Sequence, residues 1–491
     1  MFEKEQKELQ DQIAKVLKEE DIPVLPIKWN SIPFSGEWGL STSFFENASA
    51  KAKVEKGIDV KKLAAGTAAI VSSRIELPMT FSKVDGVNGY LNFKFVSEYY
   101  AQKVIDNILE LKDKYGAGKS IDQRVMVEYS QPNTHKAFHV GHLRNMVLGS
   151  AICELLDFSG LEVIRTNYLG DIGLHVIKWL WNYIHFHAGE EPPAEGKTRW
   201  MGALYAEAAK KIDENPDYEE QVRALFKRWD EKEPEIVTLW KKTRQWSLEA
   251  FDEVYALLGI HFDKVYFESE VEESGKDIVQ KLIADGLAKD ERPEGAVIID
   301  LDAIMGTTEK YRVVVILRSD GTSLYPTKDL PLAIMKFEQF EISRSIYVID
   351  VRQSLYMQQI FKILELMGYG WAKDCYHLAY ELVNLPGNVT IASREGTVVL
   401  LEDLISEAQK RALEIVEEKN PELGESVKAD IALKVAIGAI KYSLLSRDNT
   451  KIITFDWESA MNVNGQAAPY IQYAAVRANS ILRKVQLDRK S

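Results

Sequence analysis

Apolar residues recur along the chain with spacings that separate regions of different expected structure. From residue 3 to 20 they recur every three or four positions, a period that predicts an amphipathic helix. Helical spacing returns in three further segments, residues 48–56, 60–75 and 97–114. Residues 89–96 predict a strand, and the glycine-rich residues 115–120 predict a hinge. We therefore expect an α+β domain over residues 1–118.

The next region alternates predicted strands and helices. Residues 124–128 predict a strand, residues 140–158 a helix and residues 160–167 a second strand. This order implies a right-handed crossover and hence a parallel sheet. The alternation resumes in residues 346–350, 354–367 and 376–382. The expected fold is α/β, a doubly wound parallel sheet of the Rossmann type over residues 119–388.

Two stretches show helical spacing without predicted strands. Residues 186–262 are charged and rich in tryptophan, and we expect them to form a helical insertion in the sheet domain. Packing is expected, rather than stacking on nucleic-acid bases, for four tryptophans in and just before this stretch, Trp179, Trp181, Trp200 and Trp229. His185 and His187 favour a solvated helix edge over a metal site. Residues 389–491 predict an all-helical C-terminal domain.

Composition excludes several classes of protein. The 491 residues are too many for a single core. A net charge of −13 argues against wholesale attraction to nucleic acid, although a local basic stripe stays compatible with it. The sequence has two cysteines, no secretion signal and no apolar run of membrane-spanning length. A cytoplasmic protein without a membrane partner is expected.

Residues 128–144, EYSQPNTHKAFHVGHLR, carry the first chemical signal. His139 and His142 bracket Gly141 at a predicted strand-to-helix turn, where a glycine permits close approach of a phosphate. The following helix presents free N–H groups and its positive dipole end to the same point. Lys136 adds a mobile positive charge. The alternative is that two histidines near a glycine merely cap the helix.

This segment resembles the HxGH signature of class I aminoacyl-tRNA synthetases, in the form found in arginyl-tRNA synthetases. Three further segments are similar to that family, NYLGDIGLH at 167–175, SDGTSLYPTKD at 319–329 and VIDVRQ at 348–353. Residues 441–445, 455–457 and 468–473 resemble its helical C-terminal domain, which binds the anticodon. Residues 36–92 resemble more loosely the N-terminal domain that contacts the tRNA elbow.

The resemblance implies ATP-dependent activation of L-arginine to arginyl-adenylate and its transfer to the 3′ end of arginine tRNA. It also implies Mg²⁺ bridging the ATP phosphates. The expected oligomeric state is a monomer. Two alternatives stay open: a paralogue that activates arginine or an analogue for another acceptor, and a catalytically silent regulator that binds arginine or RNA.

The resemblance also assigns the arginine-binding residues. It places the guanidinium among Tyr325, Asp329 and Glu268, and the α-amino end near Asn133 and Gln353. Glu128 is a further residue of the same pocket. Tyr325 and Asp329 are four positions apart, so on a helix they share one face. The alternatives are a surface helix acid for Asp329 and a core aromatic for Tyr325.

For ATP, the resemblance implies contacts from six residues, Lys136, His139, Gly141, His142, Gly170 and Asp171. Attack of the arginine carboxylate on the α-phosphate needs positioning and charge stabilisation but no protein nucleophile. Neither Cys153 nor Cys375 is therefore expected to be catalytic.

Two features depart from the family. Its second signature loop carries a lysine, whereas the matching residues 390–399 have Thr390 and Glu395 at those positions. Lys136 is then expected to substitute, with Arg394 as a further candidate catalytic residue. The family's C-terminal domain also continues past the point where this sequence stops. A truncation, a partner chain supplying the missing helices, or a paralogue would each produce this ending.

Overall fold

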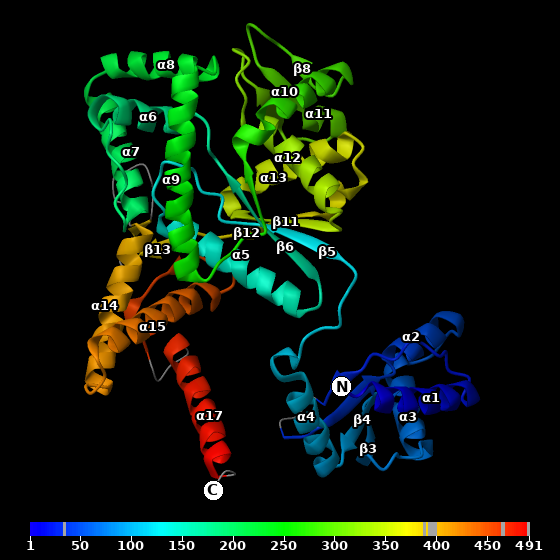
Figure 1. Cartoon of the computed structure of the whole chain (residues 1–491). Helices are drawn as coiled ribbons and strands as arrows, with labels where there is room; N and C mark the ends of the chain where they lie inside the picture. The colour runs from blue at the N-terminus through cyan, green and yellow to red at the C-terminus, as the bar shows by residue number, and fades with distance from the viewer. Residues whose placement is uncertain (33–35, 386–388, 391–399, 463–466, 489–491) are drawn as a thin grey trace. The chain divides into compact units, whose positions relative to one another are not determined.

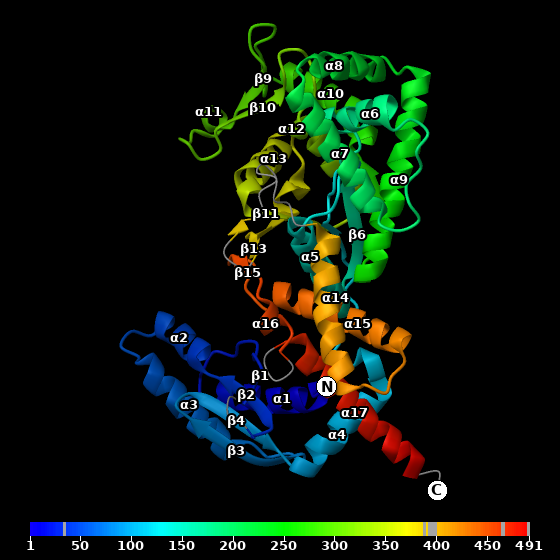
Figure 2. The same ribbon diagram turned by 90° about the vertical axis from the view of Figure 1, so that its left-hand side faces the viewer.

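The computed structural model describes residues 1–32, 36–385, 389–390, 400–462 and 467–488 (Figures 1 and 2). The chain divides into two compact units, Met1–Ala117 and Gly118–Ser491. No helix in the described ranges combines the length and apolar character needed to cross a membrane.

The first unit is a four-stranded antiparallel sheet packed on helices. The strand order is β1 (Asn30–Ser31), β2 (Gly39–Ser43), β4 (Tyr90–Phe95) and β3 (Phe81–Val87). The helices are α1 (Glu3–Glu19), α2 (Phe45–Val54), α3 (Val60–Arg74) and α4 (Ser97–Leu111). The four predicted helices are confirmed, but of the strands only β4 was predicted from the sequence.

The second unit is built on a five-stranded parallel sheet. Its order is β12 (Cys375–Tyr380), β11 (Arg344–Asp350), β5 (Arg124–Glu128), β6 (Glu162–Leu169) and β7 (Lys264–Phe267). The predicted doubly wound α/β sheet is confirmed. The fifth strand, β7, is too short for its periodicity to have been recognised.

Both faces of this sheet are covered by helices. Val125 and Val127 of β5 lie in one core together with residues of α5 (Val140–Phe158), whereas Met126 lies in a second core on the opposite face. That opposite face carries α12 (Tyr325–Phe340) and α13 (Ser354–Leu366), as Figure 1 shows. The strand order reverses between β5 and β11. In open α/β sheets, ligands bind at the carboxyl ends of the strands at such a reversal.

The predicted helical insertion is also present. After α6 (Leu174–Phe186), it contains α7 (Lys197–Glu214), α8 (Asp217–Asp230) and α9 (Pro234–Leu258). Trp179, Trp181 and Trp229 are buried in its core, with Trp200 packed against them, so their predicted packing role is confirmed. A small antiparallel sheet that the sequence did not reveal follows, formed by β8 (Lys289–Asp290), β9 (Val297–Asp300) and β10 (Val313–Leu317).

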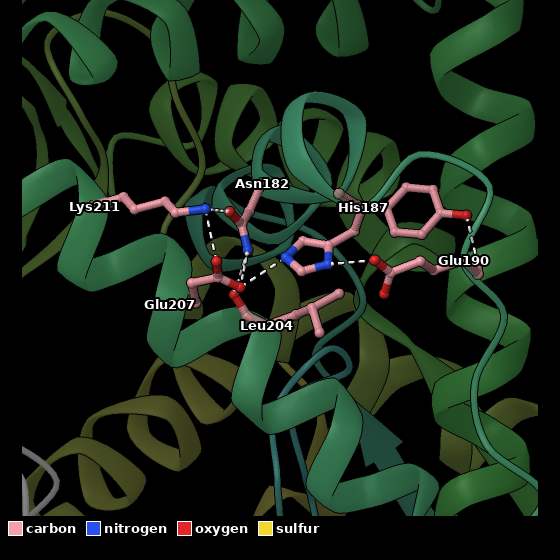
Figure 3. A network of polar contacts seen from close by, with 7 residues as sticks. Asn182, His187, Glu190, Leu204, Glu207 and Lys211 are labelled. Atoms are coloured by element: carbon pink, nitrogen blue, oxygen red, sulfur yellow. Dashed lines mark hydrogen bonds and ion pairs between the residues drawn. The ribbon is translucent and has the colours of Figure 1, made fainter.

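His185 lies exposed on α6, as predicted, but for His187 the prediction of a solvated edge is wrong, because its side chain is only 19% exposed. Figure 3 shows its ring between two acids, with Nε2 2.7 Å from Glu207 and Nδ1 3.0 Å from Glu190. Although burial raises the pKa of Glu207, hydrogen bonds from Lys211, Asn182 and His187 lower it to about 2. The network fastens α6 to α7. In the described residues, no three His, Cys, Asp or Glu side chains are grouped to hold a metal ion.

The C-terminal segment contains α14 (Leu401–Lys419), α15 (Glu425–Leu445), α16 (Trp457–Ala460) and α17 (Ala468–Asp488). It is not entirely helical, because β15 (Ile453–Thr454) pairs in parallel with β13 (Val383–Leu385), which in turn pairs with β14 (Val389–Thr390). Two-residue strands leave no periodic signal, and only their partner reveals them. Residues of α14 and α15 also share the core of α5.

Arg144, in the second turn of α5, joins these parts. Its guanidinium is buried and donates hydrogen bonds to three backbone carbonyls, those of Leu382, Asn449 and Lys451, at 3.0–3.3 Å. Burial lowers its pKa. This one side chain therefore links α5 to the residue just before β13 and to the loop between α15 and β15.

Candidate active site

The HxGH turn forms the N-terminus of α5. His139 is the N-cap residue, and its Nδ1 accepts a hydrogen bond from the backbone N–H of Gly141 at 3.1 Å. The Nδ1 of His142 accepts in return from the backbone N–H of His139 at 3.2 Å, and the two rings stack with centroids 3.8 Å apart. A Cβ on Gly141 would lie 2.9 Å from the His139 ring. A side chain at position 141 would therefore push the His139 ring out of its stacked position.

Both imidazoles are neutral donors in this geometry. Burial, with Lys136 and Arg352 nearby, lowers the pKa of His139 to about 4, and burial lowers the pKa of His142 well below its usual value. Because each Nδ1 accepts a backbone hydrogen bond, the ring proton resides on Nε2. The alternative of helix capping and the phosphate role are therefore compatible: one nitrogen caps and the other stays available to a ligand oxygen.

Lys136 lies beside this turn with its ammonium 4.7 Å from the ring centroid of Tyr205 on α7. Burial lowers its pKa, and the nearby Lys178 lowers it further. It forms no ion pair with an acid of the described chain. Arg352, which the sequence did not single out, adds a positive charge near His139, although its guanidinium also binds Asp350 at 2.8 Å. The surroundings of the turn are thus basic, as a phosphate group requires.

The second signature loop begins and ends at described positions. Its backbone enters at β14, and after it Leu400 forms a bridge with His139 while the Leu401 N–H donates to the Phe138 carbonyl at 3.1 Å. The loop therefore returns to the HxGH turn. Arg394 and Glu395 lie outside the described residues, as does the side chain of Thr390, so the role predicted for Arg394 stays a prediction.

All six residues predicted to bind arginine line one cavity of about 300 Å³, which we call the acidic cavity. It lies at the carboxyl ends of the parallel strands. The predicted members are Glu128, Asn133, Glu268, Tyr325, Asp329 and Gln353. Tyr325 and Asp329 lie one turn apart on α12, the helix that their shared-face argument required. The other polar side chains that line the cavity were not predicted, namely Gln131, Tyr168, Tyr347 and Tyr356.

Two of the three acids that line this cavity form ion pairs with lysines. Glu128 pairs with the fully buried Lys336, and Glu268 pairs with Lys328 at 2.7 Å. Asp329 accepts a hydrogen bond from the Tyr356 hydroxyl and has no ammonium partner among the residues that the structure describes. Three carboxyl groups therefore face two ammonium groups. The cavity is one positive charge short when Asp329 is ionised.

The environment of Asp329 favours its neutral form until a cation enters the cavity. Burial raises its pKa to about 7; the Tyr356 hydrogen bond opposes this shift, and Glu128 and Glu268 add to it. A ligand cation reverses the balance, because an opposite charge nearby stabilises the carboxylate. Lys336 had a signal in the sequence: it is seven residues after Asp329, on a helix that is otherwise apolar there.

The two residues predicted from the NYLGD segment differ in their surroundings. Gly170 bridges to Asn133, and a Cβ on it would lie 2.2 Å from the Asn133 Oδ1, so only glycine admits that side chain. Asp171 is fully buried and binds Arg244 at 2.7 Å and both the N–H and hydroxyl of Ser269. Its carboxylate is thus occupied by protein groups, and its predicted ATP contact stays a prediction.

A larger hollow of about 700 Å³, the outer cleft, adjoins the acidic cavity. Asn133, Glu268 and Tyr325 border both. Its other walls include residues of α8, of α10 (Glu268–Ala284), of the loop before α12 and of α12 itself. The cationic side chains among them are Arg223, Lys276, Arg318 and Lys328. The acidic cavity is therefore approached through a space wide enough for a second reactant.

A doubly wound parallel sheet with an HxGH turn at its first strand defines a catalytic domain of the class I aminoacyl-tRNA synthetases. Residues 104–457 match the family model described as the class I (R) tRNA synthetase catalytic domain. The chain belongs to the arginyl-tRNA synthetase family of that class.

Individual relatives agree with this assignment. The chain is 36% identical over 421 residues to an arginine–tRNA ligase of Bdellovibrio bacteriovorus, covering 84% of this chain and 71% of that protein. It is 38% identical over 405 residues to one of Treponema denticola, covering 82% and 68%. The arginyl-tRNA synthetase structure of Thermus thermophilus superposes with a TM-score of 0.75 at 27% identity, covering 98% of this chain and 82% of that one.

Proposed function

We propose that this protein joins L-arginine to the 3′ end of arginine tRNA at the cost of ATP. The observation that carries the proposal is the acidic cavity. Its net charge of minus one, with Asp329 ionised, matches a single guanidinium, and planar carboxylates pair well with that fork of donors. The HxGH turn supplies a basic, donor-rich site for the triphosphate.

The proposed chemistry divides along the site. Asn133 and Gln353 hold the α-amino end, while Glu268, Tyr325 and Asp329 hold the guanidinium. The arginine carboxylate then displaces pyrophosphate from the α-phosphate. The Nε2–H groups of His139 and His142 and the ammonium of Lys136 stabilise the charge that develops on phosphate oxygens. A ribose hydroxyl of the tRNA finally attacks the adenylate carbonyl and releases AMP.

We propose that Mg²⁺ accompanies ATP and bridges its phosphates. Its role is to offset the negative charge of the leaving pyrophosphate. The described residues around the HxGH turn are basic rather than acidic, which fits a metal carried mainly by the phosphates.

The remaining assignments are also proposals. Residues 1–118 contact the tRNA elbow, and residues 389–491 belong to the anticodon-binding part. The protein acts as a monomer in the cytoplasm. Cys153 and Cys375 are buried free thiols, which fits a reducing compartment. Light scattering of the purified protein tests the monomer, and co-purification from its own cells tests for a partner chain.

The deciding experiment is arginine-dependent ATP–pyrophosphate exchange, run with and without arginine tRNA and followed by a charging assay. Exchange and charging with tRNA present are the expected result. Exchange without any transfer to tRNA points to a different acceptor. Arginine binding without exchange points to a silent regulator.

A further inference from the structure

The two lysines that pair with acids of the acidic cavity differ in how firmly they are held. Lys336 and Glu128 have side chains that are 0% and 4% exposed, and Lys336 borders neither the acidic cavity nor the outer cleft. Lys328 and Glu268 are 11% and 10% exposed, and Lys328 borders the outer cleft. Lys328 therefore has a space into which its ammonium can move, and Lys336 has none.

Lys328 also occupies a carboxylate that the substrate needs. Its Nζ lies 2.7 Å from the Glu268 Oε2, and Glu268 borders the acidic cavity alongside Asp329. A guanidinium that reaches Glu268 must therefore share this oxygen with Lys328 or displace it. Among the described residues, no other lysine or arginine forms an ion pair with Glu268, and its neighbours Asp171, Glu272 and Asp329 are acidic.

We propose that Lys328 is a specificity-determining residue that occupies the guanidinium subsite on Glu268 in the free enzyme and is displaced into the outer cleft by arginine. The inference rests on the proposed arginine function and deepens it. In this view the ammonium of Lys328 competes with the guanidinium of arginine for the carboxylate of Glu268.

Such a competitor discriminates between cationic amino acids. Free lysine gains nothing at Glu268, since it exchanges one ammonium for another that is tethered at an effective concentration of roughly millimolar or more. Arginine brings five donors in a planar fork, so it can bind Glu268 and Asp329 together. The tethered ammonium therefore excludes lysine at little cost to arginine.

The test replaces Lys328 by methionine, which keeps the length of the side chain and removes its charge. Lys276→Met is the matched control, because Lys276 borders the same cleft but pairs with Glu273 at 3.2 Å. Binding of L-arginine and of L-lysine to the full chain is measured by calorimetry in two buffers of different ionisation enthalpy. This design yields both the affinity and the number of protons released.

In Lys328→Met we expect the preference for arginine over lysine to fall about tenfold or more, which corresponds to about 1.4 kcal/mol. Glu268 loses its only cation and takes up a proton in the free protein, so more protons are released per arginine bound at pH 7. A merely structural role for Lys328 does not change that number. In the control, Lys276→Met, the preference for arginine over lysine and the number of protons released should both equal those of the parent protein.

Unchanged preference and unchanged proton release in Lys328→Met overturn the inference. If that variant fails to fold, Lys328→Gln replaces it with the same expected results. If the parent protein binds no arginine, the proposed function itself fails. If it binds arginine but Lys328→Met behaves as the parent, only the role of Lys328 fails.

Discussion

The two halves of the site solve opposite electrostatic problems. The acidic cavity gathers three carboxyl groups, and two of them are offset by Lys328 and Lys336. The HxGH turn gathers Lys136, Arg352 and two histidines, and it avoids excess charge by keeping both rings neutral. In one half, lysines offset most of the carboxylate charge, whereas the other half presents neutral histidine donors beside two cationic side chains.

The two halves of the site are expected to respond differently to mutation. Removing a group from the acidic cavity leaves a buried charge without its partner, which is costly. Removing a donor from the HxGH turn weakens stabilisation of the transition state and leaves the resting protein little changed. Substitutions in the two halves should consequently separate arginine binding from the rate of activation.

The largest expected effect is that of Asp329→Asn. It removes the one acid without an ammonium partner, so the guanidinium loses a buried ionic contact worth about 2–5 kcal/mol, or roughly thirty- to several-thousand-fold in kcat/KM for arginine. The KM for ATP should stay near the parent value in pyrophosphate exchange. Asp285→Asn is the control, because Asp285 is an exposed acid at the end of the helix Glu268–Ala284. Equal losses for arginine and ATP contradict the division of the site.

Lys136→Met tests the other half. We expect kcat for activation to fall roughly 10²-fold or more, as for loss of one transition-state donor, with arginine affinity little changed. Single-turnover formation of the adenylate and equilibrium binding of arginine provide the two readings. Lys227→Met, on the exposed side of α8, serves as the control. A change confined to arginine affinity contradicts the assignment of Lys136 to ATP.

Gly170→Ala should disturb the acidic cavity by shape alone. The new Cβ meets the Asn133 Oδ1 at 2.2 Å and displaces that side chain, at a cost of about 1–3 kcal/mol. The KM for arginine should rise, and the KM for ATP should rise by a smaller factor. Gly370→Ala is the control, since a Cβ there has no atom within 4 Å. A normal arginine KM in Gly170→Ala removes Asn133 from the pocket.

The smallest effect is a pH dependence peculiar to the acidic half. The pKa of Asp329 is about 7 in the free protein, and the bound guanidinium requires the ionised form. Arginine affinity should therefore rise with pH up to about 7 and fall about tenfold for each unit below it. Calorimetric titrations between pH 5.5 and 8 on the parent protein measure it. The same dependence in Asp329→Asn would assign it to another group.

The sequence was sufficient for long periodic elements and for residues held in motifs. The four helices of the first unit, the strands β5, β6, β11 and β12, and the six residues of the acidic cavity all have such local signals. The short strands β7, β13 and β15 did not, because two to four residues carry no period and form only when a distant partner is present.

Compensating charges were missed for a related reason. Lys328 looks like an ordinary helix lysine in the sequence, and the apolar surroundings of Lys336 do not indicate its partner. Only packing brings them to Glu268 and Glu128, from 60 and 208 residues away. The engagement of Asp171 by Arg244 is equally non-local. A motif indicates which acids belong to a site, but it does not indicate which of them are already paired.

Arg144 has a consequence for mutational tolerance. Among the described residues, all its hydrogen-bond acceptors are backbone carbonyls, so replacing the side chains of Leu382 or Lys451 removes none of them. Asn449 differs, because its side-chain amide also donates to the Ala379 carbonyl at 2.6 Å. A substitution scan would therefore report this junction at residues 144 and 449 and stay almost silent at 382 and 451, although all four positions meet at one point.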